Sequence, residues 1–137
     1  MGRYCTTLDT LRFRKGITCD VLSFYEKEGH DQPSREEILS RGHADNASMD
    51  EVAFFCFLRN ADKVPLKWWN CAFIFPDAYY PHTGEVRCVF RDQYFVLHDV
   101  WIRVFEQRWH NYVLIRLTLP EKSRRKKHHV PMEESYD

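Results

Sequence analysis

The sequence lacks an excess of charge of either sign. Twenty Lys and Arg residues balance twenty Asp and Glu residues over 137 positions, and the isoelectric point is close to 7. A neutral chain has no long-range field to draw it onto nucleic acid or an anionic membrane. Any binding of that kind must come from a local patch, which has to be located by position.

Paired cysteines and long apolar runs are also missing. The five cysteines are odd in number, and none belongs to a Cys-x-x-Cys pair: Cys5, Cys19, Cys56, Cys71 and Cys88. This pattern argues against a disulfide framework and a zinc knuckle, and predicts reduced, buried thiols. No stretch approaches the ~20 apolar residues that span a bilayer, and no apolar signal segment follows the N-terminus. We therefore expect an intracellular protein with no membrane partner.

Aromatic residues, by contrast, are abundant. Phe, Tyr and Trp make up 15% of the chain, and each buried ring removes on the order of 150–250 Å² from water, so one core is well supplied. A chain of this length fits a single domain. The apolar pattern stops after Pro120. We expect a β-rich globular domain over residues 1–120 and a disordered tail over 121–137, basic at first and acidic at its end.

Short apolar segments separated by polar breaks predict strands over most of this domain. In the last segment Val113, Ile115 and Leu117 alternate with Arg116 and Thr118, the period-two signature of a half-buried strand. The expected strands are one or two within 7–28, then 52–58, 66–75, 86–90, 94–97, 100–105 and 112–119. The predicted fold class is mainly β, a single-domain antiparallel sandwich or partial jelly roll.

One short helix is expected in the polar segment that follows the first strands. Ser34 and Glu37 form a capping box ahead of Ile38 and Leu39, and Gly42 stands where a helix would end.

The segment Val52–Leu58 is ambiguous between strand and helix. Its continuous, aromatic-rich apolar run suits a strand buried on both faces. Ser48 and Glu51 form a second capping box, however, which would start a helix. We favour the strand.

The most specific chemical feature is a run of cations in the tail: Lys122, Arg124, Arg125, Lys126 and Lys127. Cations on a flexible segment can reach phosphates, and the same pattern is read as a nuclear import signal. The alternative is a solvated tail that aids solubility.

Catalytic and metal sites are weakly supported. His98 and His110 could join a cysteine as zinc ligands, and Cys88 could pair with His98, but neither set has the spacing of a known site. Asp77 and Glu85 lie where a metal nuclease would hold carboxylates, yet Arg87 stands at the Lys position and cannot act as an adjustable base. We expect no enzyme, no metal and no cofactor.

Aromatic side chains beside arginines could stack on bases. Trp101 and Phe105 share one face of the expected strand 100–105, with Arg103 between them. Because the opposite face is also apolar, we favour a central strand buried between two layers, and we favour burial for Trp68 and Trp69 as well.

One stretch carries a family resemblance. Pro81-x-Thr83, Val86-Arg87 and Phe90-Arg91-Asp92-Gln93-Tyr94-x-Val96-Leu97, preceded by the run Phe54–Arg59, resemble the geminivirus coat proteins and nuclear shuttle proteins. Asn60 and Gln93 depart from the family's Asp and Arg. Pro81–Gly84 with Val89–Gln93 also looks like the geminivirus replication enhancer, a small nuclear accessory protein.

The resemblance covers about half the chain, from Val52 to Phe105, and implies a jelly-roll fold, entry into the host nucleus from the cytoplasm, and association with single-stranded DNA. We therefore hypothesise a non-enzymatic viral protein that contacts DNA through the tail cations and through Arg87, Arg91, Arg103 and Arg108. A nuclear import receptor would be its second partner. The alternative hypothesis is a nuclear accessory protein that acts through protein–protein contacts, including self-association into a homo-oligomer.

Overall fold

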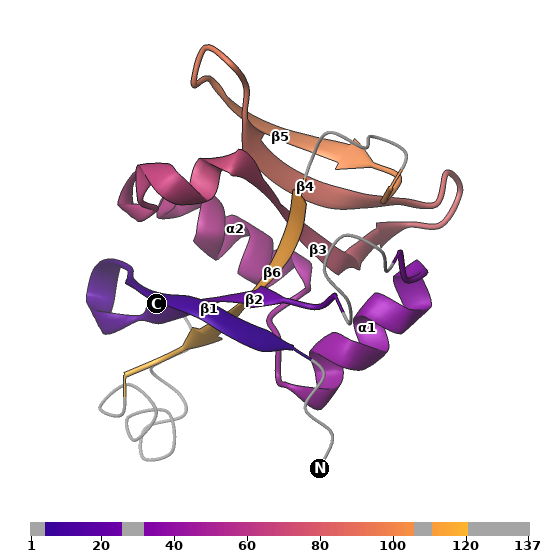
Figure 1. The fold of residues 1–137 in the computed structure, drawn as a ribbon, viewed down its shortest axis with the longest axis horizontal. Helices are drawn as coiled ribbons and strands as arrows, with labels where there is room; N and C mark the ends of the chain where they lie inside the picture. Colours follow the sequence, from indigo (N-terminus) through magenta and orange to yellow (C-terminus); the bar gives the residue numbers. More distant parts are fainter. Residues whose placement is uncertain (1–4, 26–31, 106–110, 121–137) are drawn as a thin grey trace, which may run out of the picture.

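The structure is a computed structural model that describes residues 5–25, 32–105 and 111–120. Six strands form one sheet (Figure 1): β1 Thr6–Arg12, β2 Thr18–Ser23, β3 Cys71–Tyr80, β4 Glu85–Arg91, β5 Leu97–Ile102 and β6 Asn111–Thr118. Two α-helices, α1 Arg35–Ala44 and α2 Glu51–Arg59, accompany three short 3-10 helices, η1 Arg14–Gly16, η2 Ala61–Lys63 and η3 Leu66–Asn70. The predicted tail and Arg108 lie outside the described residues. No helix in the described part is long and apolar enough to cross a membrane.

The prediction of a mainly β fold is confirmed, but the sheet differs from the expected antiparallel sandwich or partial jelly roll. The strand order is β1-β2-β6-β3-β4-β5, and β6 pairs in parallel with β3 through residues 111–113 and 71–73. Because β6 also pairs with β2 along residues 114–118, it joins both halves into one mixed sheet. Helices cover the faces of this sheet, and no second sheet is present among the described residues. The described residues form two α-helices, whereas the sequence predicted one.

Each face of the sheet carries its own core. On one face α2 packs Phe54 and Phe57 against Phe73 and Phe75 of β3. On the other face lies α1 with its buried Ile38. Figure 1 shows the two helices beside different parts of the twisted sheet. Burial on both faces explains why the central strands read as continuous apolar runs.

Helix α1 forms where its caps predict it. The Ser34 hydroxyl accepts a hydrogen bond from the Glu37 N–H at 3.1 Å, and the Glu37 carboxylate accepts one from the Ser34 N–H at 2.9 Å. Both halves of the predicted capping box are therefore present, and they satisfy two of the amide groups that a helix start leaves unpaired.

The expected strand at Val52–Leu58 is wrong, because this segment is helix α2. Asp50 caps it by accepting a hydrogen bond from the Ala53 N–H at 3.0 Å. The Ser48 hydroxyl instead accepts one from the Leu117 N–H at 2.9 Å. A local cap and the fit of one helix face to the sheet therefore outweigh the strand propensity of the aromatic run.

Three further expected strands need correction. The segment expected as a strand at 66–75 begins as η3 and becomes strand only at Cys71, then continues through Pro76 to Tyr80. The pairing register with β4 shifts between Phe75 and Tyr79, and such an irregularity accommodates the missing N–H of Pro76. The expected strand 94–97 is a loop as far as Val96, and β5 replaces the expected strand 100–105.

Candidate interaction surface

The three described arginines predicted to contact nucleic acid lie at the β4–β5 end of the sheet. Arg87 and Arg91 flank Val89 on β4, and Val89 belongs to the core beneath α2, so both arginines share the α2 face. Arg103 follows the end of β5. The other predicted contacts, Arg108 and the tail cations Lys122, Arg124, Arg125, Lys126 and Lys127, lie outside the described residues.

Arg87 is enclosed by aromatic rings from two elements. Its guanidinium carbon lies 4.6 Å from the ring centre of Phe54 and 6.0 Å from that of Phe55, both on α2. On the other side it lies 4.5 Å from the ring centre of Trp101 on β5. Its Nη2 is 3.3 Å from Oε2 of Glu51. Cation–π contacts and an ion pair therefore hold this guanidinium inside the protein surface.

Arg91, four residues further along β4, has a similar environment. Its guanidinium carbon lies 4.8 Å from the ring centre of Trp69 and 4.6 Å from that of Phe95. Its Nη1 donates to the Phe95 carbonyl at 3.0 Å. The Nε atoms of Arg87 and Arg91 are buried and have no hydrogen-bond partner within the described part of the chain. Both side chains serve mainly to bind neighbouring rings.

Arg103 is likewise engaged by the protein itself, because its Nε donates to the Thr83 carbonyl at 2.8 Å. The surrounding field does not favour anions either. Within the described ranges, twelve Lys and Arg side chains are matched by twelve Asp and Glu side chains. A phosphate would have to compete with existing partners in a domain of zero net charge.

The side of α2 that faces away from the sheet carries exposed apolar side chains between two exposed charged ones, Glu51 and Arg59. Ala53, Phe54 and Phe57 face the core, yet Val52 is 76% exposed and Phe55 is 46% exposed. A helix that packs on one side only normally carries polar residues on its other side. Val52 and Phe55 therefore form an exposed apolar area in the middle of the outer side, where such a helix would normally carry polar residues.

Further exposed rings continue this apolar area onto the strands. Trp101 of β5 is 36% exposed, and its ring centre lies 5.9 Å from that of Tyr80, which is exposed at the end of β3. The Tyr80 ring also contacts His82, at 5.4 Å between centres. We call Val52, Phe55, Tyr80 and Trp101, of which Phe55 and Trp101 lie beside Arg87, the α2 surface.

A groove of about 530 Å³ borders the same helix on its other flank. Val52 and Cys56 of α2 form one wall, and Met49, Leu117 and Leu119 contribute apolar atoms from neighbouring segments. Because Val52 belongs to both the groove and the α2 surface, the two areas are continuous.

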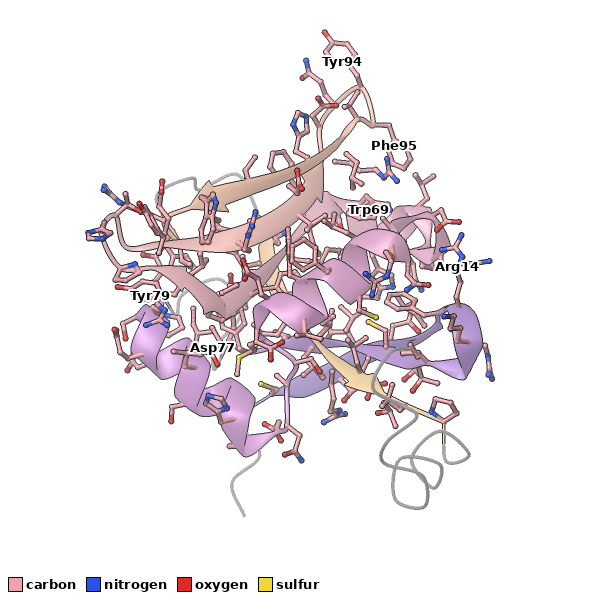
Figure 2. All side chains as sticks on the ribbon, turned by 180° about the vertical axis from the view of Figure 1, so that it is seen from behind. Arg14, Trp69, Asp77, Tyr79, Tyr94 and Phe95 are labelled. Atoms are coloured by element: carbon pink, nitrogen blue, oxygen red, sulfur yellow. The ribbon has the colours of Figure 1, made fainter. Side chains whose placement is uncertain are left out.

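The loop between β4 and β5 carries a second group of exposed apolar side chains. Tyr94 is 78% exposed at the tip of this loop and points away from the body of the molecule, whereas Phe95 lies on the side of Trp69 (Figure 2). The Asp92 carboxylate accepts hydrogen bonds from the Tyr94 and Val96 amides at 2.8 and 3.0 Å. Phe95 has a φ of 66°, a backbone conformation that costs a bulky residue energy, so neighbouring contacts must hold it.

The remaining chemistry-bearing residues form no reactive cluster in the described ranges. Burial raises the pKa of the Cys88 thiol to about 12, so this thiol stays protonated at neutral pH. His98 instead places its Nε2 2.8 Å from Oδ2 of Asp92. Among residues 5–25, 32–105 and 111–120, no three His, Cys, Asp or Glu side chains are grouped to hold a metal ion.

The sequence located the arginines but missed the apolar surface beside them. Trp101 was expected in a buried central strand, yet β5 is an edge strand and leaves the ring partly exposed. Trp69 is buried, as expected, but Trp68 is only partly buried. The outward position of Val52 and Phe55 becomes evident only when 51–59 is read as a helix, and the cap ahead of it was the available signal.

No family model, curated protein or solved structure matches this chain. The geometry of the described residues is therefore the basis for assigning a function.

Proposed function

We propose that this protein is a non-enzymatic interaction factor that binds a protein partner through the α2 surface. The observation that carries the proposal is the exposure of Val52 and Phe55 on the outer side of a helix whose inner side already fills the core. Protein interfaces are enriched in aromatic side chains and Arg at their centre and depleted in other charged groups. The α2 surface has this composition.

The arrangement of Arg87 supports a protein ligand over a nucleic acid. Its guanidinium is stacked between Phe54 and Trp101 and paired with Glu51, which fixes the surrounding rings in place. Rings that are ordered before binding lose less conformational freedom when a partner arrives. The ion pair with Glu51 also takes up an N–H group that a phosphate oxygen would otherwise bind.

The experiment is site-specific photo-crosslinking in cells that produce the chain. A benzoylphenylalanine residue replaces Phe55 in one variant and Leu8 in the control, since Leu8 is an equally apolar, 43% exposed residue on β1. We expect a discrete adduct from position 55 and none from position 8. Val52→Glu should abolish the adduct, because it places a charge in the centre of the apolar contact.

A matched second substitution distinguishes a specific contact from nonspecific hydrophobic association. Leu8→Glu adds the same charge on the distant edge strand and should leave the adduct from position 55 intact. Equal crosslinking from positions 8 and 55, or an adduct that survives Val52→Glu, would contradict the proposal.

A second candidate function, nuclear entry with contact to single-stranded nucleic acid, rests on the five cations between Lys122 and Lys127. The described domain is neutral, so such binding would come from the tail and would weaken steeply with salt. This candidate keeps the DNA and import-receptor partners implied by the geminivirus resemblance.

Its test is fluorescence anisotropy with a single-stranded oligonucleotide across a salt series, using the full chain and a chain ending at Pro120. Binding confined to the full chain assigns it to the tail. Binding retained by the shortened chain would assign it to the β-domain and weaken the argument made from Arg87, Arg91 and Arg103.

A further inference from the structure

The two edge strands of the sheet are protected to different degrees. At one edge, β1 carries an irregularity between Thr7 and Asp9 that interrupts its register with β2. At the other edge, β5 pairs regularly with β4 over six consecutive residue pairs, from Leu97–Arg91 to Ile102–Val86. Bulges and charges are the usual means by which an edge strand is kept from pairing with another chain. Strand β5 has no bulge, and its only acidic residue is Asp99.

No strand among the described residues pairs with the outer edge of β5. We propose that this edge binds a second copy of the same chain, with the two β5 strands antiparallel across a two-fold axis. The inference goes beyond the proposed function, because it concerns the backbone edge of β5 and a second copy of the chain, although Trp101 and Tyr80 also belong to the α2 surface.

Symmetry restricts the register of such a pair. A two-fold axis that relates antiparallel strands of one sheet is normal to that sheet. It therefore passes midway between the two copies of one residue. Side chains on a given face of one copy lie on the same face of the joined sheet as their equivalents in the other copy. Within the six residues of β5, only axes at Asp99 or Val100 allow five residues to pair. An axis at Asp99 would place two carboxylates opposite each other, which is destabilising. The axis therefore passes at Val100.

Charge complementarity favours this register and a second copy as the occupant. With the axis at Val100, Asp99 of one copy lies opposite Trp101 of the other. Arg87 of that copy lies on the neighbouring strand, with its guanidinium 4.5 Å from the centre of the same Trp101 ring. Each copy thus places its Asp99 opposite a ring that Arg87 of the other copy contacts, and the two-fold axis repeats this arrangement. Zero net charge on the chain leaves no overall repulsion between copies.

The contact would extend beyond the paired backbones. A stable interface buries on the order of 1,600 Å² in total, more than five residue pairs supply. The exposed ring of Trp101 belongs to the edge strand and contacts the exposed ring of Tyr80 on β3, and the half-exposed Val96 directly precedes β5. In this dimer both α2 helices lie on the same face of a continuous sheet, so two α2 surfaces are presented to one side.

The test measures the mass of the full chain in solution by light scattering after size exclusion, at concentrations up to about 100 μM, a range that detects micromolar affinity. We expect twice the chain mass of 16.6 kDa. Asp99→Lys should raise the dissociation constant at least about ten-fold, because it places a lysine beside Arg87 of the second copy. Leu8→Lys, the same change on the β1 edge, should leave it unchanged.

Hydrogen exchange locates the interface without relying on a variant that folds. Amides of residues 97–102 should become more protected as the wild-type concentration rises, and those of β1 should not. A mass of 16.6 kDa at every concentration overturns the dimer, as does a dimer without added protection in β5. Neither result affects the crosslinking test at Phe55, which a monomer can satisfy.

Discussion

At the scale of single residues, Asp92 organises the loop that projects from the sheet. Hydrogen bonds from His98 and from the Val96 and Tyr94 amides hold the pKa of Asp92 below its ordinary value. A carboxylate whose pKa is lower in the folded state stabilises that state above its unfolded pKa of about 3.9, and this contribution is lost as the pH falls through the folded value.

We therefore expect the β4–β5 loop to open below about pH 4, before the sheet unfolds. Hydrogen exchange of the Tyr94 and Val96 amides should accelerate relative to those of β6 as the pH falls, after correction for the intrinsic pH dependence. Asp92→Ala should produce the same acceleration already at pH 7. Asp77→Ala, at an exposed carboxylate of β3, serves as the control. Unchanged relative exchange in Asp92→Ala would refute the assigned role.

The five thiols should differ sharply in reactivity. Burial raises the pKa of Cys19 well above its ordinary value and that of Cys5 to about 11, and Cys88 is fully buried. Cys56 is only partly buried and lines the groove beside α2. Because thiolates are the reacting species and must be reached by reagent, Cys56 should react first.

A disulfide reagent at pH 8 should therefore label one thiol rapidly and leave Cys19 and Cys88 unreacted until the chain unfolds. Cys56→Ser should remove the rapid phase. Mass spectrometry of the labelled peptides identifies the site, and rapid labelling of Cys88 would show that the core opens far more readily than its packing indicates.

At the scale of elements, α2 packs on one side only. Phe57 is fully buried and contacts the rings of Phe73 and Trp69, at 4.5 and 6.1 Å between centres. Removing such a ring from a core costs about 3–5 kcal/mol. Val52, on the outer side, should tolerate replacement by Ala within about 0.5 kcal/mol.

Urea unfolding of Phe57→Ala and Val52→Ala measures this contrast. A large loss of stability in both variants would show that both sides of this segment are packed, as expected for the buried strand that the sequence suggested. A large loss in Phe57→Ala alone would agree with the one-sided helix and leave Val52 available for a partner.

Local signals in the sequence identified most elements and failed where two of them competed. Alternation identified β6, and the capping box identified α1. At 51–59 the capping box expected at Ser48 and Glu51 and the apolar run pointed to different structures, and neither could show that a sheet would lie on only one side. The loop at 92–96 depends on Asp92 and on the positive φ of Phe95, which an apolar sequence of strand-forming residues conceals.

Local sequence signals predicted the candidate site less well than they predicted the helices and strands. Arg87 and Arg91 were selected from the sequence as cations, but their environment comes from residues far along the chain. Phe54 precedes Arg87 by 33 positions, and Trp69 precedes Arg91 by 22. Such contacts follow from the order of strands in the sheet, and no local pattern encodes that order. The rings around these arginines were therefore not predictable.

At the scale of the whole molecule, two cores share one sheet, and β6 is the strand that links them. Leu114 and Ile115 are adjacent on β6, fully buried, and directed into opposite cores. Since β6 also joins β2 to β3, loss of either core removes support from both halves of the sheet. The domain should therefore unfold in a single cooperative transition.

We expect Leu114→Ala and Ile115→Ala each to lower stability by about 2–5 kcal/mol. Each substitution should lower the urea midpoint of unfolding by the same amount, whether unfolding is followed in the core beneath α2 or in the core beneath α1. Thiol labelling provides both probes, because Cys19 lies in the core beneath α2 and Cys88 in the core beneath α1. If Ile115→Ala exposed Cys19 at a lower urea concentration than Cys88, the two cores would be independent units. Equal exposure of both thiols in both variants would show that β6 couples them.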